Sequence, residues 1–175
     1  MFTKNYIIIK AQYLNRFNSE WKSDILLNLI TLANGNLFTG VGDDTYPMSA
    51  MYTISNIRAS GAGQMYATGI FIDVGTSDIE ATSDDYALKS PSLELTASNH
   101  TAVLPNNGID GIIINRTFSN KTDSDITIKE VGLYQNIPYY RRTGTDSIAL
   151  LAREVLSNPI TLKPNQSRQF TFSIK

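Results

Sequence analysis

Two runs of β-branched and aromatic residues joined by a short polar segment constrain the fold of this chain more than any other feature. The first run occupies residues 111–118, the second occupies residues 126–134, and both are rich in Ile, Val and Thr. Such residues favour a pleated, half-buried surface. The segment between them, residues 119–125, contains only polar residues, most of them common in turns. The sequence therefore predicts a β-hairpin at the centre of an all-β core.

The second arm of this hairpin contains a break in its alternation. Ile126 and Ile128 fall on one face of the strand, whereas Val131 and Leu133 fall on the other. A β-bulge near residues 129–130 would return the apolar side chains to one face. Burial of both faces of the strand is the alternative.

Two charged residues fall inside otherwise apolar strands. Glu130 lies in the second arm, and Arg153 lies in residues 147–156, which we interpret as a strand although their composition also suits a helix. A buried charge requires a partner. We therefore predict that Glu130 and Arg153 form a structural ion pair across neighbouring strands. Two solvated side chains are the alternative.

Further strands are predicted on both sides of the hairpin. They are residues 5–10, 66–74, 92–97, 160–162 and 168–175. In the last of these, Phe170, Phe172 and Ile174 alternate with polar residues, which predicts a strand with one solvent-facing side. The predicted connections are an acidic loop, a turn-rich passage and a tight turn, at residues 75–89, 98–111 and 163–166. Within the acidic loop, residues 86–88 are expected to turn back toward the core.

The N-terminal part of the chain differs from this pattern. Residues 19–34 predict the only amphipathic helix, with Ser19 as its N-cap and Asn34-Gly35 as its end. The residues after it, 36–65, are predicted to be an irregular or extended interaction segment. Their Met48, Met51 and Tyr52 suit an adaptable contact surface, and an ordinary core is the alternative.

Length and strand spacing together predict the architecture. The chain has 175 residues, 42% of them hydrophobic, which suits a single domain, residues 1–175. Its strands follow one another at the spacing typical of β-sandwiches. We predict a mainly β fold in which residues 1–35 form a strand and the helix, and residues 66–175 form an antiparallel, jelly-roll-like sandwich.

The chain offers few groups for catalysis. It has no cysteine, which excludes disulfides, zinc–thiolate sites and a cysteine nucleophile. Its one histidine, His100, lies in a turn-rich passage, and no GxSxG motif or phosphate-binding glycine loop is present. The acids of residues 73–85 could ligate calcium, but their spacing departs from an EF-hand and a solvated loop is preferred. We therefore expect no enzyme, and no catalytic, cofactor-binding or metal-binding residue.

A short aromatic and basic cluster is the best candidate for binding. It consists of Tyr139, Tyr140, Arg141 and Arg142. Such a cluster suits stacking on nucleic acid, a protein interface or a plain loop tip. The net charge is −1, so no overall field attracts nucleic acid or an acidic membrane. We therefore favour a protein interface, and the short apolar run near the N-terminus predicts neither a signal peptide nor a membrane span.

Several stretches of the C-terminal part occur in an order that resembles a known class of proteins. They are Asp-Asp-Tyr-Ala-Leu at 84–88, Arg-Thr-Phe-Ser-Asn at 116–120, Ile-Lys-Glu-Val-Gly-Leu-Tyr at 128–134 and Leu-Leu-Ala-Arg-Glu-Val-Leu at 150–156, followed by the final strand. This pattern covers about residues 70–175. It resembles small structural proteins of tailed-bacteriophage virions, and the Asn- and Tyr-rich composition also suits a gut phage such as a crAss-like podovirus.

The resemblance implies a non-enzymatic virion component, made in the host cytoplasm and arranged in symmetric copies on the capsid, neck or tail. Its expected partners are other virion proteins and further copies of itself, as a homo-oligomer. A carbohydrate- or receptor-binding β-module of a phage fibre is the alternative, and it would need exposed aromatic residues in a groove.

Overall fold

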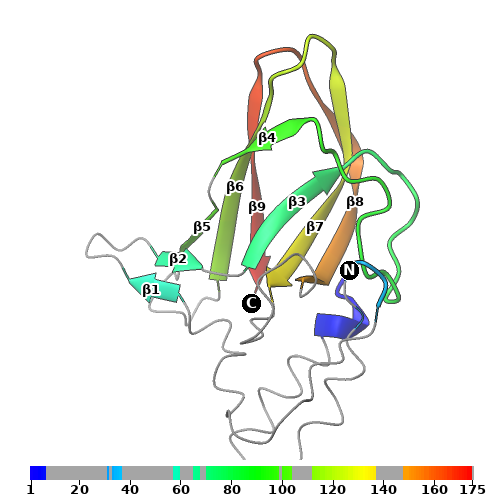
Figure 1. Cartoon of the computed structure of the whole chain (residues 1–175), viewed down its shortest axis with the longest axis vertical. Helices are drawn as coiled ribbons and strands as arrows, with labels where there is room; N and C mark the ends of the chain where they lie inside the picture. The colour runs from blue at the N-terminus through cyan, green and yellow to red at the C-terminus, as the bar shows by residue number, and fades with distance from the viewer. Residues whose placement is uncertain are drawn as a thin grey trace, which may run out of the picture.

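A computed structural model describes residues 1–6, 31, 33–36, 57–59, 65–67, 70–98, 100–103, 112–136 and 148–174. These residues are mainly β and form two antiparallel sheets, as predicted at this coarse level. In Figure 1 the long strands run along the tall axis of the molecule, and both chain ends lie toward the opposite end from the upper turns. Among the described residues, no helix has the length and apolar character needed to cross a membrane.

The smaller sheet has three strands in the order β3-β7-β8. They are β3 (Ile70–Gly75), β7 (Ile126–Asn136) and β8 (Ile148–Leu162). The larger sheet has six strands, in the order β1-β2-β5-β6-β4, with β9 paired to β6. They are β1 (Ile57–Ala59), β2 (Met65–Ala67), β4 (Leu95–Ala97), β5 (Thr101–Val103), β6 (Ile112–Asn120) and β9 (Ser167–Ile174).

The predicted central hairpin is wrong in its pairing, although both of its strands exist. β6 pairs with β4, β5 and β9, whereas β7 pairs with β3 and β8 in the other sheet. The polar residues 121–125 therefore cross from one sheet to the other, and so does the turn at residues 163–166. Apolar strands can bury their side chains side by side or face to face, and alternation along a strand does not distinguish these two arrangements.

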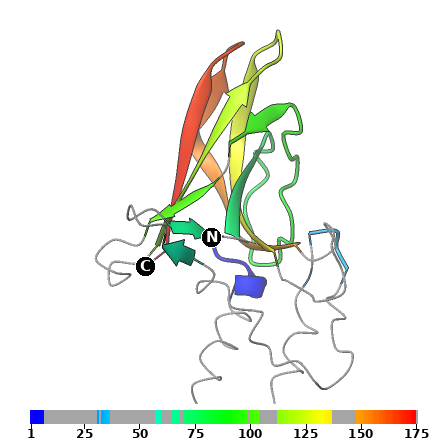
Figure 2. The ribbon, with the colours of Figure 1, turned by 60° about the vertical axis from the view of Figure 1, so that its left-hand side comes forward.

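Asn120 ties the two crossing turns together at one end of the molecule, where Figures 1 and 2 show them. Asn120 N donates to Gln166 O at 2.9 Å, and Asn165 N donates to Asn120 O at 2.8 Å. The buried side chain of Asn120 donates from Nδ2 to the carbonyl oxygens of Leu162 at 2.8 Å and Ser124 at 2.7 Å. One side chain thus bonds to backbone acceptors at both turns.

Both sheets contribute to one hydrophobic core. Its fully buried members include Ile72 of β3, Ile114 and Phe118 of β6, and Leu133 of β7. Phe118 also meets Phe170 of β9 edge to face, with ring centroids 5.8 Å apart. The prediction that one side of β9 faces solvent is confirmed, because the residues that alternate with its phenylalanines are exposed.

Several element boundaries differ from the predictions. The single strand expected at 66–74 is two strands, β2 and β3, which belong to different sheets. Part of the expected turn-rich passage forms β5, and residues 92–94 lie outside any strand. The strands expected at 147–156 and 160–162 are one strand, β8, which continues through Pro159.

The N-terminal predictions are mostly outside the described residues. Residues 4–6 form a helical turn, so the strand expected at 5–10 is wrong at its start. The helix expected over 19–34 does not reach its predicted end, because Thr31 forms a β-bridge and residues 33–34 form a turn. Gly35 has a φ of 83°, the left-handed conformation that is common at the end of a helix, although here it follows a turn.

The pairing of β7 with β8 is irregular where the alternation of β7 breaks. Ile128 lies opposite Ile160, but Glu130 lies opposite Val155, so the extra residues belong to β8 rather than to β7. The offset places Pro159 where no ladder hydrogen bond is required. From Glu130 onward both faces of β7 are buried. Burial of both faces therefore describes this half of the strand, and the irregularity lies in its neighbour.

Candidate functional site

The second buried face of β7 is covered by the segment between β3 and β4, residues 76–90, which we call the strap. Leu88 of the strap packs against Tyr134 and Leu150, and Leu88 N donates to the Tyr134 hydroxyl at 2.8 Å. A Cβ on Gly132 would lie 3.0 Å from side-chain carbons of both Leu88 and Tyr134. Gly132 therefore allows the strap to lie directly on the strand.

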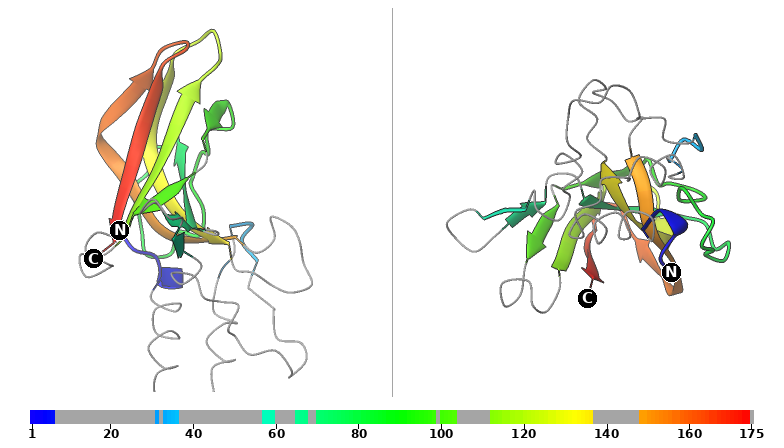
Figure 3. Two further views of the ribbon diagram at one scale, coloured as in Figure 1. Left: turned by 90° about the vertical axis from the view of Figure 1, so that its left-hand side faces the viewer. Right: turned by 90° about the horizontal axis from the view of Figure 1, so that it is seen from below.

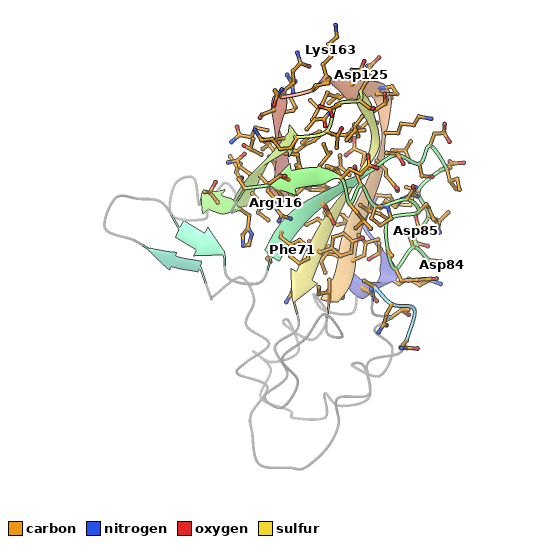
Figure 4. The ribbon with its side chains drawn as sticks, turned by 45° about the horizontal axis from the view of Figure 1, so that its top comes forward. Phe71, Asp84, Asp85, Arg116, Asp125 and Lys163 are labelled. Carbon is orange, nitrogen blue, oxygen red and sulfur yellow. The ribbon has the colours of Figure 1, made fainter. Side chains whose placement is uncertain are left out.

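Buried charged groups lie beneath the strap. Arg153 Nε donates to Glu130 Oε2 at 2.7 Å, and both side chains are fully buried. Arg153 Nη1 donates to Asp85 Oδ2 at 2.9 Å. The structure therefore brings together the two predicted partners, Glu130 and Arg153, on neighbouring strands. It adds Asp85 of the strap as a third member, and Figure 4 labels this residue. We call these residues, together with Lys89, the ion cluster.

The ion cluster also bonds to the backbone of the strap. Arg153 Nη2 donates to the carbonyl oxygen of Ile79 at 2.7 Å. Glu130 accepts from Lys89 N at 3.1 Å and from Ser90 N at 2.8 Å. A buried ion pair is stable only where such bonds replace the lost water. The cluster thus fastens the strap near both of its ends.

Asp85 is ionised and also bonds to two other residues of the strap. Its Oδ1 contacts Lys89 Nζ at 2.9 Å, and its Oδ2 accepts from Thr82 N at 2.9 Å. Burial raises the pKa of Asp85, but the hydrogen bonds from Thr82, Lys89 and Arg153 together outweigh it and lower the pKa to about 2. The formal charges of Arg153 and Lys89 balance those of Glu130 and Asp85, so the cluster is neutral as a whole.

The other acids of residues 73–85 do not converge on one point. Asp78 pairs with Lys129 at 2.8 Å, and Asp84 pairs with Lys4. Burial raises the pKa of Asp73, which accepts a hydrogen bond from the adjacent backbone. Among the described residues, no three or more His, Asp or Glu side chains are grouped as a metal site would require.

Arg116 joins the two sheets, and the sequence did not single it out. From β6 it donates through Nη1 to the carbonyl oxygen of Ile72 in β3, at 2.6 Å. Its guanidinium carbon lies 5.7 Å from the ring centroid of Phe71 and 5.3 Å from that of Phe118, within cation–π range. Figure 4 shows Arg116 and Phe71 on a different side of the molecule from Asp85. A charged residue between apolar positions of a strand was the available signal.

The remaining candidates from the sequence are distributed as follows. The predicted interface residues Tyr139, Tyr140, Arg141, Arg142, Met48, Met51 and Tyr52 all lie outside the described residues. His100 lies beside Phe71, with ring centroids 6.5 Å apart. Of the residues expected to turn back toward the core, Leu88 is buried but Tyr86 is 43% exposed.

The geometry defines a β-protein in which a strap is fastened across a sheet by buried charges. In the part of the chain that the structure describes, the one buried side-chain nitrogen or oxygen without a hydrogen-bond partner is Gln135 Nε2, so every buried polar atom of the ion cluster is bonded. No protein-family model, curated protein or solved structure matches the chain. The arrangement itself is suited to holding a loop in place.

Proposed function

We propose that the protein is a non-enzymatic structural component of a tailed-bacteriophage virion. It is built as an antiparallel β-sandwich and assembles in symmetric copies on the capsid, neck or tail. The observation that carries the proposal is that two of the stretches behind the resemblance, a first motif at residues 128–134 and a second at residues 150–156, meet in one structural unit. Glu130, Gly132 and Tyr134 come from the first motif, Arg153 comes from the second, and together they hold the strap.

The contacts in this unit explain why the residues of the two motifs would occur together. A motif that fastens a loop to a sheet marks a shared fold, whereas a motif made of exposed reactive groups would mark a shared reaction. The sandwich form is supported by the core that both sheets share and by the two turns that cross between them. Two sheets that bury one common core are the usual basis of a sandwich.

Protein–protein contact is supported by the outer side of the strap and the residues after it. Ile79, Tyr86 and Leu93 expose large apolar side chains to solvent, and Leu93 is 92% exposed. The ion cluster holds the backbone beneath Ile79 in place. A loop that is already ordered loses little conformational entropy when it binds, which favours its use as a contact surface.

The proposal predicts a discrete oligomer, or a complex with another virion protein. Light scattering of the purified chain during size-exclusion chromatography measures its mass. Replacing Tyr86 and Leu93 together by Ser should shift the protein to a smaller species while its far-UV circular dichroism stays unchanged. Arg168→Ser, an exposed change on β9, is the matched control. A strict monomer that binds no other virion protein would contradict the proposal, and a monomer that binds sugars would favour the fibre module.

A further inference from the structure

The outer edge of β8 pairs with the first residues of the chain. Thr3 N donates to Leu151 O at 2.9 Å, and Arg153 N donates to Met1 O at 3.0 Å, on either side of the bridge between Phe2 and Ala152. The other edge of β8 is occupied by β7. Residues 1–3 therefore supply the partners for the outward-facing backbone groups in this part of β8.

Two buried polar side chains make this contact specific. Thr3 is fully buried, and its Oγ1 donates to Leu150 O at 2.7 Å. Asn5 is also buried, and its side-chain amide donates to Thr31 O at 2.7 Å and accepts from Thr31 N at 2.9 Å. An apolar residue at either position would remove these hydrogen bonds from buried or partly buried backbone groups. The contact thus selects a Thr-x-Asn pattern.

We call the place that residues 1–5 occupy beside β8 the slot, and the strap forms its second wall. Lys4 N donates to Ser83 O at 2.9 Å, and the Lys4 side chain pairs with Asp84. The strap is in turn fixed by Arg153, whose backbone pairs with Met1 and whose side chain belongs to the ion cluster. The slot is therefore bounded by a strand edge on one side and by a fastened loop on the other.

We propose that this slot is a peptide-binding site for a segment with the Thr-x-Asn pattern that is extended over its first three residues, and that residues 1–5 of a second copy fill it when copies assemble. The contact consists of main-chain hydrogen bonds and the hydrogen bonds of two buried side chains, so it requires no covalent continuity between segment and slot. Exchange of an identical segment between copies re-forms the same bonds. The inference rests on the proposed multi-copy assembly and names the segment that links the copies.

Paired single-cysteine chains test the exchange, because the natural chain has no cysteine. The hydrogen bonds flank the pair Phe2 and Ala152, which makes it a non-hydrogen-bonded pair. The Cα atoms of such pairs lie about 4.5 Å apart, within the range of a disulfide. A Phe2→Cys chain is mixed with an Ala152→Cys chain and oxidised. Exchange predicts a disulfide-linked heterodimer as the main product on non-reducing electrophoresis.

Two control chains separate exchange from random collision. Ser157→Cys places a thiol on an exposed position of the same strand, so its yield with Phe2→Cys measures random collision. Adding Thr3→Val to the Phe2→Cys chain should abolish the specific heterodimer. A heterodimer no more abundant than the Ser157 control would overturn the proposal. If light scattering still shows an oligomer in that case, the exchange alone has failed and the proposed function stands.

A second measurement applies if the Ala152→Cys chain does not fold. A fluorescent peptide of residues 1–6 is titrated into the full-length Thr3→Val chain, whose own segment is weakened. Fluorescence anisotropy should show saturable binding of this peptide, and the same peptide carrying Thr3→Val should not bind. Failure of the unmodified peptide to bind would overturn the proposal.

Discussion

Strands β7 and β9 are neighbours of the same core but face different surroundings on their other side. β9 has one face in the core, through Phe170 and Phe172, and one face in water. β7 has both faces covered from Glu130 onward, by the core on one side and by the strap on the other. Figure 3 shows these strands from two further directions.

The comparison shows what a charged residue does in each setting. Arg168 of β9 is exposed and keeps its water, so its charge requires no partner. Glu130 on β7 has lost its water and depends on Arg153 and on the strap backbone. Substitutions in the ion cluster and at exposed positions on β9 therefore test whether burial of the second face determines how much each substitution lowers the stability of the protein.

Removal of Arg153 should have the largest effect on stability. Arg153→Met leaves Glu130 and Asp85 buried without their shared cation, and breaking a buried ion pair in this way lowers the free energy of unfolding by about 3–5 kcal/mol. Urea unfolding followed by circular dichroism measures the change. The matched change Arg168→Met on β9 should stay within about 0.5 kcal/mol. Equal losses in the two variants would contradict the comparison.

Gly75→Ala should come next. A Cβ at this position would lie 2.4 Å from Ser90 O and 2.5 Å from Glu130 Oε1, so the strap or the ion cluster would have to move. Overpacking of this kind lowers the free energy of unfolding by about 1–3 kcal/mol, and the backbone contact places this case near the upper value. Thermal unfolding measures it, with Ser173→Val on the exposed face of β9 as the control. A neutral Gly75→Ala would mean that the strap does not lie this close.

Tyr134→Phe should have a moderate effect. It removes the phenol oxygen that accepts from Leu88 N, and a buried donor left without an acceptor costs about 1–2 kcal/mol. Tyr86→Phe, an exposed change on the strap, should be neutral by the same urea measurement. If both variants are neutral, the Tyr134 hydroxyl does not hold the strap.

Acid should weaken the strap by the smallest amount. The pKa of Asp85 is lowered to about 2 in the folded protein, below its ordinary value of 3.8. A group with a lowered folded pKa contributes stability above its unfolded pKa, and this contribution is lost as the pH falls toward the folded value. The urea midpoint should therefore fall between about pH 4 and pH 2, and less so in Asp85→Asn. Asp84→Asn, the exposed control, should fall as far as the natural chain.

The sequence predicted where the strands lie better than it predicted which strands pair with one another. β9 follows a clean alternation, and both its location and its exposed face were predicted correctly. The break in alternation in β7 was also real, and so was the need of Glu130 for a partner. What could not be predicted is that residues 121–125 cross between sheets, because a polar turn has the same composition in a hairpin and in a crossing.

The strap was missed for a different reason. Residues 76–90 are polar and acidic, which predicts a solvated loop, and most of their side chains are indeed exposed. Their anchoring depends on backbone groups, such as the Lys89 and Ser90 amides bound by Glu130, and these carry no signal in the side-chain pattern. Asn120 and Arg116 were missed likewise, because they bind mainly backbone oxygens of distant segments.

Hydrogen exchange of the strap amides tests the central claim most directly. If the ion cluster and Tyr134 fasten the strap, the amides of Leu88, Lys89 and Ser90 should exchange as slowly as the paired amides of β7, although they lie in a loop. In contrast, the amide of Asp84, an exposed residue of the strap, should exchange quickly. Exchange of Leu88, Lys89 and Ser90 at the rate of an open loop, while β7 stays protected, would contradict the claim.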